Sequence, residues 1–283
     1  MAPTLIVDTF SLFFRSFFAL PPLSTTTGQP TSALYGFSSV LIKVWREHRP
    51  IAASFARDLP QPTFRHEAWS GYKANRGAPP AGLRAQLARL DELLDAFGFP
   101  VIAVPGYEAD DVMATLARTL PEPLLVTGDH DCLQVAGGAT RVLIVGRGKV
   151  KDRLYDADEV RRAFGVGPER VPDWIALVGD PSDNLPGVPG VGEKTATRLL
   201  QAYGDVDGVL AHVGEIAPER LRDVLAAHAA ELRTWRDLAK LRDDAPLPPG
   251  PYAGKLTDDA KGKLKVLFEE WELRSLLPRL AEM

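Results

Sequence analysis

The sequence predicts an α/β protein whose central, mostly parallel sheet is covered by helices on both faces. Short apolar runs of the strand type alternate, in the first half of the chain, with stretches in which apolar residues recur at helical spacing. This alternation is typical of such sheets. Acidic residues follow several of the apolar runs. Because ligands bind at the carboxyl ends of strands in open α/β sheets, the recurrence indicates one acidic site at that edge.

The bulk composition restricts the class of protein. The 283 residues suffice for one large or two small domains, and a net charge of −4 does not by itself indicate a nucleic-acid binder. The single cysteine, Cys132, excludes an internal disulfide and fits a reducing compartment. The Phe-rich N-terminus lacks the basic start of a signal peptide, and no stretch is apolar enough to span a membrane. We therefore expect a cytoplasmic protein without a membrane partner.

The elements of the first half follow from apolar patterning and from residues that end helices. Buried strands are predicted at residues 4–8, 51–55, 101–104, 123–127 and 141–145. Amphipathic helices are predicted between them at 10–20, 33–48, 83–97 and 112–118. Pro21 and Pro22 end the first helix, and Gly98 is placed as a C-cap for the third.

The second half is predicted to be helical from about residue 156. Helices are expected at 171–178, from the glycine-rich stretch through residue 200, within 218–241, and at 258–273, where Thr257 is placed as the N-cap. A proline-rich connector lies at 243–254. This change of character divides the chain into an α/β part and a helical part.

The candidate site consists of acids at strand ends and in loops. An isolated Glu108-Ala109-Asp110-Asp111 segment would indicate helix capping, but the repetition of acids after other strands favours a site. Such acids would repel one another without cations, and oxygen ligands select Mg²⁺ or Mn²⁺ over Zn²⁺. Two ions about 3.5–4 Å apart could support phosphodiester cleavage. The candidate ligands are Asp8, Glu108, Asp110, Asp111, Asp129, Asp131, Asp180 and Asp183.

Two further stretches each allow a functional and a structural interpretation. Residues 57–89 interleave basic residues with Phe64, Trp69 and Tyr72, which fits either a solvated loop or a grip on single-stranded nucleic acid. Residues 187–196 are rich in glycine ahead of a helix. They could present backbone N–H groups to a phosphate, or form a helix–turn–helix corner without a ligand.

Several motifs occur together in one order. They are Val7-Asp8 with Arg15, Phe64-Arg65-His66-Glu67, Tyr72-Lys73, Tyr107 to Val112, Thr127-Gly128-Asp129, Gly179 to Asn184, and Gly187 to Thr195. With these motifs the chain resembles the 5′-nuclease (5′–3′ exonuclease) domain of bacterial DNA polymerase I, in the flap endonuclease family. The resemblance covers essentially the whole chain and ends near Leu277.

The resemblance implies a PIN-like 5′-nuclease fold with an α/β core at 1–170, a helical arch at about 57–90, and a helical DNA-binding region at 171–283. It implies a first metal at Asp8, Glu108, Asp110 and Asp111, and a second at Asp129, Asp131, Asp180 and Asp183. Lys73 and Arg76 would be catalytic. A helix–three-turn–helix would bind duplex DNA and a K⁺ ion. The implied DNA-binding residues are Arg15, Arg65, Tyr72, Lys73, Arg76, Gly187, Val188, Gly190, Gly192, Lys194 and Thr195.

The chain departs from the family pattern at three positions. Thr9 replaces a preferred glycine, His130 replaces a basic residue, and Ala56 stands where the family's second strand ends in aspartate. Asp58, two residues further on, is a plausible displaced or outer-shell substitute that could reach the metals through a backbone bulge or a metal-bound water.

The leading interpretation is a structure-specific 5′ nuclease acting on 5′ flaps and on nicked or gapped duplex DNA. It would be a monomer, either a stand-alone nuclease or an isolated domain, with a DNA polymerase in trans as a candidate partner. Ala56 motivates a second interpretation, a DNA-structure-binding protein with weak or no catalysis. A ribonuclease with a smaller acidic-site sheet ranks last, because it leaves the glycine-rich stretch unused.

Overall fold

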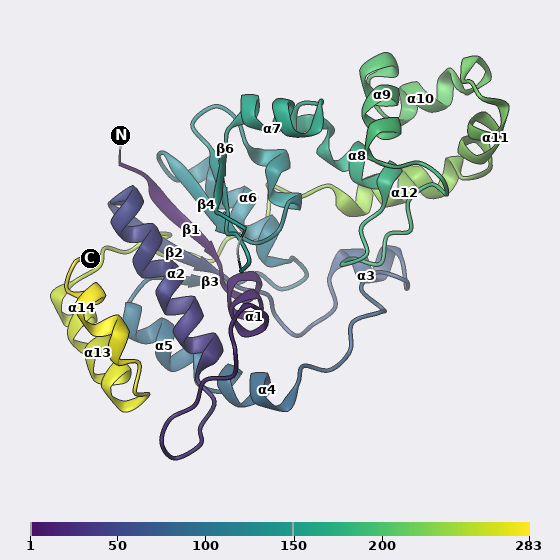
Figure 1. Cartoon of the computed structure of the whole chain (residues 1–283). Coiled ribbons are helices and arrows are strands. Elements are labelled where there is room, and N and C mark those ends of the chain that lie inside the picture. Colours follow the sequence, from purple (N-terminus) through teal and green to yellow (C-terminus); the bar gives the residue numbers. More distant parts are fainter. Residues whose placement is uncertain (1, 149) are drawn as a thin grey trace.

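A six-stranded sheet forms the centre of the computed structural model, which describes residues 2–148 and 150–283 (Figure 1). The strand order is β3-β2-β1-β4-β5-β6, and all neighbours are parallel except β5 and β6. The mostly parallel sheet predicted from the sequence is therefore confirmed. The strands are β1 (Thr4–Asp8), β2 (Ala52–Ala56), β3 (Val101–Ile102), β4 (Pro123–Thr127), β5 (Arg141–Ile144) and β6 (Arg153–Tyr155).

Alternating side chains of each strand enter two different cores, one on each face of the sheet. In β1, Leu5 and Val7 pack into one core and Ile6 into the other. The first core is closed by α1 (Thr9–Ala19), α2 (Ser32–His48) and α5 (Leu90–Phe97), and the second by α6 (Ala109–Thr119). Burial on both faces explains why the strands read as continuous apolar runs.

Two features of the core part differ from the sequence prediction. The helix predicted at 83–97 is broken into α4 (Ala81–Leu87) and α5, and the break lies at Ala88 and Arg89. The Arg89 guanidinium packs over the Trp271 ring, 4.6 Å from its centroid, a distant contact that the local pattern does not encode. The sequence also missed the three-residue strand β6, whereas α7 (Ala157–Phe164) begins where the change to helices was predicted, at about residue 156.

The segment for which a helical arch was expected has little helix. It contains the five-residue helix α3 (Phe64–Ala68) and then α4, with turns and extended backbone between them at residues 69–80. In Figure 1 this connection runs as a bare ribbon from α3 to α4. Proline and glycine in this stretch, including Gly77, Pro79 and Pro80, account for the missing helix.

The helical part of the chain is divided differently from the prediction. The helices α8 (Val171–Val178), α9 (Glu193–Tyr203), α10 (Val206–Ala211), α11 (Glu219–Ala227) and α12 (Ala229–Ala239) form a group beyond one end of the sheet (Figure 1). However, α13 (Asp258–Glu270) and α14 (Leu277–Leu280) return and pack beside α5. Phe268 and Trp271 share a core with Phe97, so these last two helices pack on the α/β core, whereas the sequence division placed them in the helical DNA-binding region.

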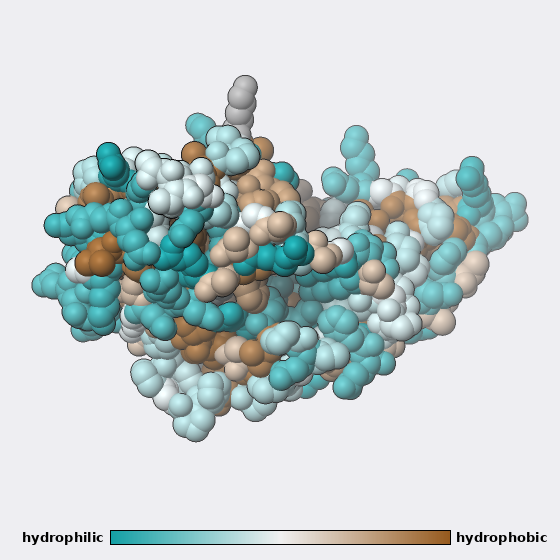
Figure 2. Space-filling view, turned by 90° about the horizontal axis from the view of Figure 1, so that it is seen from below, coloured by the Kyte–Doolittle hydropathy of each residue, from teal (hydrophilic) through white to brown (hydrophobic). Residues whose placement is uncertain are grey.

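The surface carries scattered rather than continuous apolar patches. Seen from below, hydrophilic side chains predominate, and the molecule narrows from a large lobe to a smaller one (Figure 2). The large apolar side chains that remain exposed are spread over several elements and include Phe18, Ile51 and Val266. No helix in residues 2–148 and 150–283 is long and apolar enough to cross a membrane.

Candidate acidic active site

The ends of three neighbouring strands bring the first acids together. Asp8 is the last residue of the central strand β1, Asp58 follows β2, and Asp129 follows β4. Because β2 and β4 both pair with β1 in parallel, their carboxyl ends lie at the same edge as Asp8. The α/β topology therefore places these acids at one edge of the sheet, where the sequence pattern predicted Asp8 and Asp129.

Asp8 is fixed by two hydrogen bonds. Its Oδ1 accepts the N–H of Ser11 at 3.1 Å, so the residue also caps α1, and its Oδ2 accepts the hydroxyl of Thr127 at 2.6 Å. The pKa of Asp8 is raised to about 7, chiefly by burial and also by the nearby carboxylates of Asp58 and Asp129, while the two hydrogen bonds lower it. A carboxylate with this pKa is costly to ionise without a cation nearby.

Asp110, Asp129 and Asp131 have the same electrostatic character. Burial raises the pKa of each one, most strongly for Asp110 and Asp131, and neighbouring carboxylates add to the effect. None of the three has a basic side chain within ion-pair distance in the described part of the chain. The arrangement concentrates negative charge without compensating it.

Several of the acids line an open cleft of about 950 Å³. The same cleft has apolar lining from α1 and from the segment between β2 and α4, for example Phe10, Phe14, Pro60 and Pro80. Lys73 and Arg76 stand at the cleft as well. The acids in the lining are Asp8, Asp58, Glu108, Asp110 and Asp129.

A second group of acids has the geometry of a cation site. One carboxylate oxygen from each of Asp131, Asp180 and Asp183 lies within 4.8 Å of the other two. Asp180 and Asp183 sit in the turn that follows α8, and their charges act on Asp129 and Asp131. Carboxylate oxygens are the ligands that hard divalent cations prefer, so the donor set fits Mg²⁺ or Mn²⁺.

Glu108 lies between these acids and a set of polar partners. Its Oε1 accepts from the Lys73 ammonium at 2.9 Å, and its Oε2 lies 2.7 Å from the Tyr72 hydroxyl. The same hydroxyl is 2.7 Å from Oδ2 of Asp183. Burial lowers the pKa of Lys73, but Asp183 and Glu108 outweigh it and raise that pKa above its ordinary value, so Lys73 stays charged.

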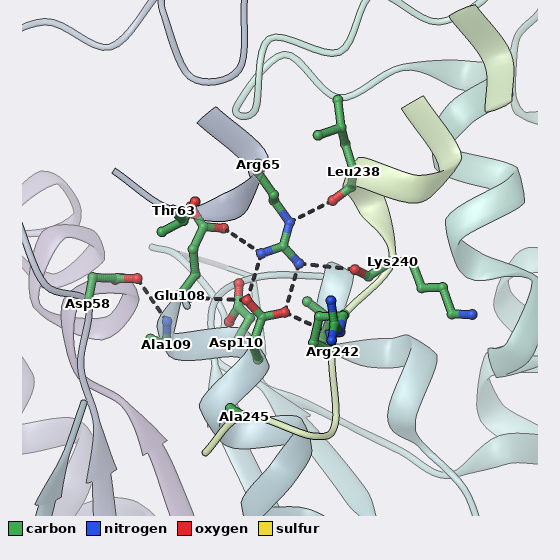
Figure 3. A network of polar contacts seen from close by, with 12 residues as sticks. Asp58, Thr63, Arg65, Glu108, Ala109, Asp110, Leu238, Lys240, Arg242 and Ala245 are labelled. Atoms are coloured by element: carbon green, nitrogen blue, oxygen red, sulfur yellow. Dashed lines mark hydrogen bonds and ion pairs between the residues drawn. The ribbon is translucent and has the colours of Figure 1, made fainter. Parts of the chain in front are cut away.

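Asp111 does not join the acidic cluster and instead binds Arg65, the guanidinium at the centre of Figure 3. It is fully buried, and its two carboxylate oxygens accept from the two terminal nitrogens of Arg65 at 2.7 and 2.8 Å. Both oxygens also accept backbone N–H groups, one from Glu108 and one from Arg242. All four of these contacts are made within the fold, so the geometry favours a structural role for Asp111 over the expected role as a ligand of the first metal.

Two residues expected to contact DNA are inaccessible. Arg65 is 1% exposed and bound to Asp111, and Tyr72 is 3% exposed and directed at Glu108 and Asp183. Their burial and contacts favour a role in holding the neighbouring acids over the expected contact with DNA. By contrast, the Arg76 side chain is 55% exposed and touches Asp183 at 3.1 Å, while Arg15 is held by the carbonyl oxygens of Gly128 and Gly146.

The glycine-rich corner has an inner and an outer part. Gly187 has φ +66°, and a Cβ there would come within 2.4 Å of the Val178 backbone, so this glycine serves packing. Val188 is also buried. Gly190, Gly192 and Lys194 are exposed at the start of α9, and Thr195 is partly exposed. Only the outer part is placed to meet a ligand.

The structure shows where Ala56, at the family's aspartate position, and its suggested substitute Asp58 lie relative to the other acids. Ala56 is buried directly beside Asp8 in the strand register, so a carboxylate at residue 56 would stand next to it. The strand ends at Ala56, and the chain turns so that Asp58 enters the cleft, where its Oδ1 accepts the N–H of Ala109 at 2.8 Å. Burial raises the pKa of Asp58 above its usual value.

Sequence reasoning assigned no site role to three residues that shape the site. The Thr127 hydroxyl and the Ser11 backbone N–H orient Asp8, and the buried thiol of Cys132 lies 3.3 Å from Oδ1 of Asp110. The Thr127-Gly128-Asp129 motif was a usable signal for the first of these. The thiol contact joins residues that are 22 positions apart, and no spacing rule indicates it.

Comparison with protein families gives two adjacent matches that together span most of the chain. Residues 3–165 match the 5′–3′ exonuclease N-terminal resolvase-like domain, and residues 166–260 match the 5′–3′ exonuclease C-terminal SAM fold. A curated relative, the thermostable DNA polymerase I of Thermus thermophilus, is 39% identical over 277 residues. The match covers 96% of this chain but 32% of that protein, so the chain spans about a third of the relative's length.

Solved structures with the same fold are more distant in sequence. The bacteriophage T5 5′-exonuclease with bound zinc superposes with a TM-score of 0.67 at 19% identity, covering 99% of this chain and 98% of the other. The T5 D15 flap endonuclease, in a complex with DNA and metal ions, superposes with a TM-score of 0.65 at 19% identity, covering 99% of this chain and 100% of the other.

Proposed function

Because the chain belongs to the 5′–3′ exonuclease family, we propose that it is a structure-specific 5′ nuclease that hydrolyses phosphodiester bonds of DNA at 5′ flaps and at nicked or gapped duplexes. The observation that carries the proposal is the convergence of uncompensated acids on one cleft, beside Lys73 and Arg76. The DNA- and metal-bound relatives support the substrate and the cofactor. In this proposal the protein works in the cytoplasm as a monomer, with a DNA polymerase as a candidate partner in trans.

We assign the metal ligands in two groups. Asp8, Glu108 and Asp110, with Asp58 as an outer contributor, would hold a first Mg²⁺ or Mn²⁺ ion, and Asp129, Asp131, Asp180 and Asp183 would hold a second. Divalent ions there would lower the pKa of a bound water and neutralise charge on the scissile phosphate. Asp111 is left out of the assignment because Arg65 occupies its oxygens.

Lys73 and Arg76 are the residues we assign to the scissile phosphate. Both are held by Asp183, Lys73 at 3.5 Å and Arg76 at 3.1 Å, and both line the cleft. A cation fixed in this way needs no reorganisation when charge develops on a phosphate oxygen. Removing either should lower the single-turnover rate more than the affinity for DNA.

The exposed part of the glycine-rich corner and α9 is proposed as the grip on duplex DNA, with K⁺ as a candidate ion in its backbone loop. Gly192 is the position that tests this grip on the duplex. Its φ of −100° is allowed for every residue type, and a Cβ there meets no neighbouring atom. Gly192→Val should weaken duplex binding without unfolding the protein. Gly214→Val, at a glycine with equal space, is the matched control.

A labelled 5′-flap duplex tests the proposed activity. The protein should release the flap with Mg²⁺ and be inert in chelator, and Asp129→Asn should abolish cleavage while DNA binding persists. Asp158→Asn changes an exposed acid of α7 and should behave like the unaltered protein. Tight flap binding without any cleavage would instead favour the DNA-structure-binding alternative, which the missing carboxylate at Ala56 supports.

A further inference from the structure

Arg65 lies where three distant segments meet. It belongs to α3, it pairs with Asp111 in the first turn of α6, and its remaining donors reach the end of α12 (Figure 3). Its Nε donates to the carbonyl oxygen of Leu238 at 2.7 Å, and one terminal nitrogen donates to that of Lys240 at 3.0 Å. The other terminal nitrogen also lies 3.4 Å from Oε2 of Glu108.

The guanidinium is fully committed to these contacts. Every N–H group has an acceptor, the residue is 1% exposed, and the fork is planar, so its donors cannot adjust independently. A shift of the end of α12 must therefore move the guanidinium or break its bonds. The same group touches Glu108, which also contacts Lys73.

The chain that leaves α12 is fastened to α6 at further points. The backbone N–H of Arg242 donates to Oδ1 of Asp111 at 2.8 Å, and that of Ala245 donates to the hydroxyl of Thr115 at 3.0 Å. At its other side α12 packs along α8, the helix that precedes the Asp180–Asp183 turn and the glycine-rich corner. The glycine-rich corner and the acidic site are thus connected through α8, α12 and the buried contacts of Arg65 and Asp111.

We propose that Arg65 is a positioning residue that couples duplex binding by the glycine-rich corner and α9, through α8 and α12, to the orientation of Glu108 in the acidic site. The proposal rests on the proposed function, since it takes duplex DNA and a divalent cation as the two ligands. Because coupling between two sites is reciprocal, a duplex bound to the helices must tighten cation binding by the same factor by which the cation tightens duplex binding. Arg65 itself contacts neither ligand.

The test measures Mn²⁺ affinity without any cleavage. Free Mn²⁺ is followed by electron paramagnetic resonance, with and without a saturating covalently closed dumbbell duplex that has no 5′ end, nick or flap. In the unaltered protein the dumbbell should tighten Mn²⁺ binding by on the order of tenfold. Arg65→Lys keeps a positive charge beside Asp111 but cannot also bond both carbonyl oxygens of α12. It should reduce the coupling factor to below about twofold.

Arg242→Ala is the matched control, because it removes an exposed positive side chain nearby and leaves the backbone bond to Asp111 in place. It should keep the coupling factor of the unaltered protein.

If circular dichroism shows that Arg65→Lys does not fold, Asp111→Asn replaces it in the test. This variant weakens the α6 side of the connection and should also reduce the coupling factor. An equal coupling factor in the folded variant and the unaltered protein overturns the proposal, as does the absence of coupling in the unaltered protein. A protein that couples but never cleaves flaps would refute the nuclease and leave this inference standing.

Discussion

The acids at the edge of the sheet fall into two groups that differ in how their charge is compensated. Asp111 and Glu108 are paired with Arg65, Tyr72 and Lys73. Asp8, Asp110, Asp129 and Asp131 have no ion pair among the residues that the structure describes, and burial raises the pKa of each. Both groups have similar sequence settings at or near a helix N-terminus or a strand end.

The difference separates carboxylates that protein side chains already compensate from carboxylates that need an external cation. A paired buried carboxylate stabilises the folded state only while its partner is present. An unpaired one destabilises the folded state when it ionises, and a bound divalent cation reverses that cost. The comparison therefore predicts opposite responses to the same type of substitution in the two groups.

Arg65→Ala should produce the largest effect on stability. It leaves the fully buried Asp111 carboxylate without its partner, which should lower the free energy of unfolding by about 3–5 kcal/mol. Urea unfolding measures the loss, and the change should be the same with and without Mg²⁺. A loss below about 1 kcal/mol would mean that this buried ion pair contributes no more to stability than an exposed one, and the contrast between the two groups of acids would disappear.

Asp110→Asn should act in the opposite direction in metal-free protein. It removes a charge from the unpaired group, so the free energy of unfolding at neutral pH should rise in chelator. With Mg²⁺ the order should reverse, because the variant loses a ligand. A variant that is less stable than the unaltered protein in chelator would show that Asp110 is compensated by something other than a cation.

The pH dependence of metal-free stability is the next largest effect. The pKa of Asp8 rises from 3.8 in the unfolded chain to about 7 in the folded protein, so between these values the folded state binds more protons than the unfolded state. Stability must then fall as pH rises through this window and level off above it, by at most about 4 kcal/mol from this group. Carboxylates whose pKa is lowered by a basic partner in the folded state would instead make stability rise with pH.

Saturating Mg²⁺ should flatten the same curve, since the cation replaces the proton as the compensating charge. Chemical denaturation at closely spaced pH values from 4 to 8 gives both curves. Identical curves with and without Mg²⁺ would mean that the acids are not ligands. Asp158→Asn, at an exposed acid, serves as the control and should leave both curves unchanged.

The sheet and the group of acids at its edge could be predicted because they depend on local patterns. Apolar runs fix the strands, and an acid directly after a parallel strand must lie at the shared edge. The segment 57–89 shows the limit of this reasoning. Its Arg65 and Arg76 look alike in sequence, yet one is buried in an ion pair and the other is mostly exposed.

The fates of Arg65 and Asp111 depend on residues far away in the chain. The carbonyl oxygens that hold Arg65 belong to Leu238 and Lys240, which lie 173 and 175 positions away. Backbone atoms carry no residue signature, so no pattern could indicate this connection. For the same reason the sequence assigned Asp111 to the metal, because its spacing from Glu108 and Asp110 fits a ligand as well as a structural acid.

Asp58→Ala tests whether a displaced acid belongs to the unpaired group. Asp58 accepts the N–H of Ala109 at the start of α6, so it orients the helix that carries Asp110. Its loss should lower the rate of flap cleavage by about 10- to 100-fold, as for other outer-shell ligands. Ala56→Asp, which places a carboxylate directly beside Asp8, should partly restore the rate in that background. Asp91→Ala is the control, and full activity of Asp58→Ala would make Asp58 a bystander.

Cys132 provides the smallest and most specific test of the comparison. Its buried thiol lies 3.3 Å from Oδ1 of Asp110 and is the one side-chain donor to that carboxylate in the described part of the chain. Cys132→Ser keeps a donor there, whereas Cys132→Ala removes it. In chelator the alanine variant should therefore be less stable than the serine variant by about 1 kcal/mol. With saturating Mg²⁺ the cation takes over the compensation of Asp110, so the difference between the two variants should shrink. If the difference stays the same with and without Mg²⁺, the thiol only fills space, and Asp110 does not exchange its partner for a cation.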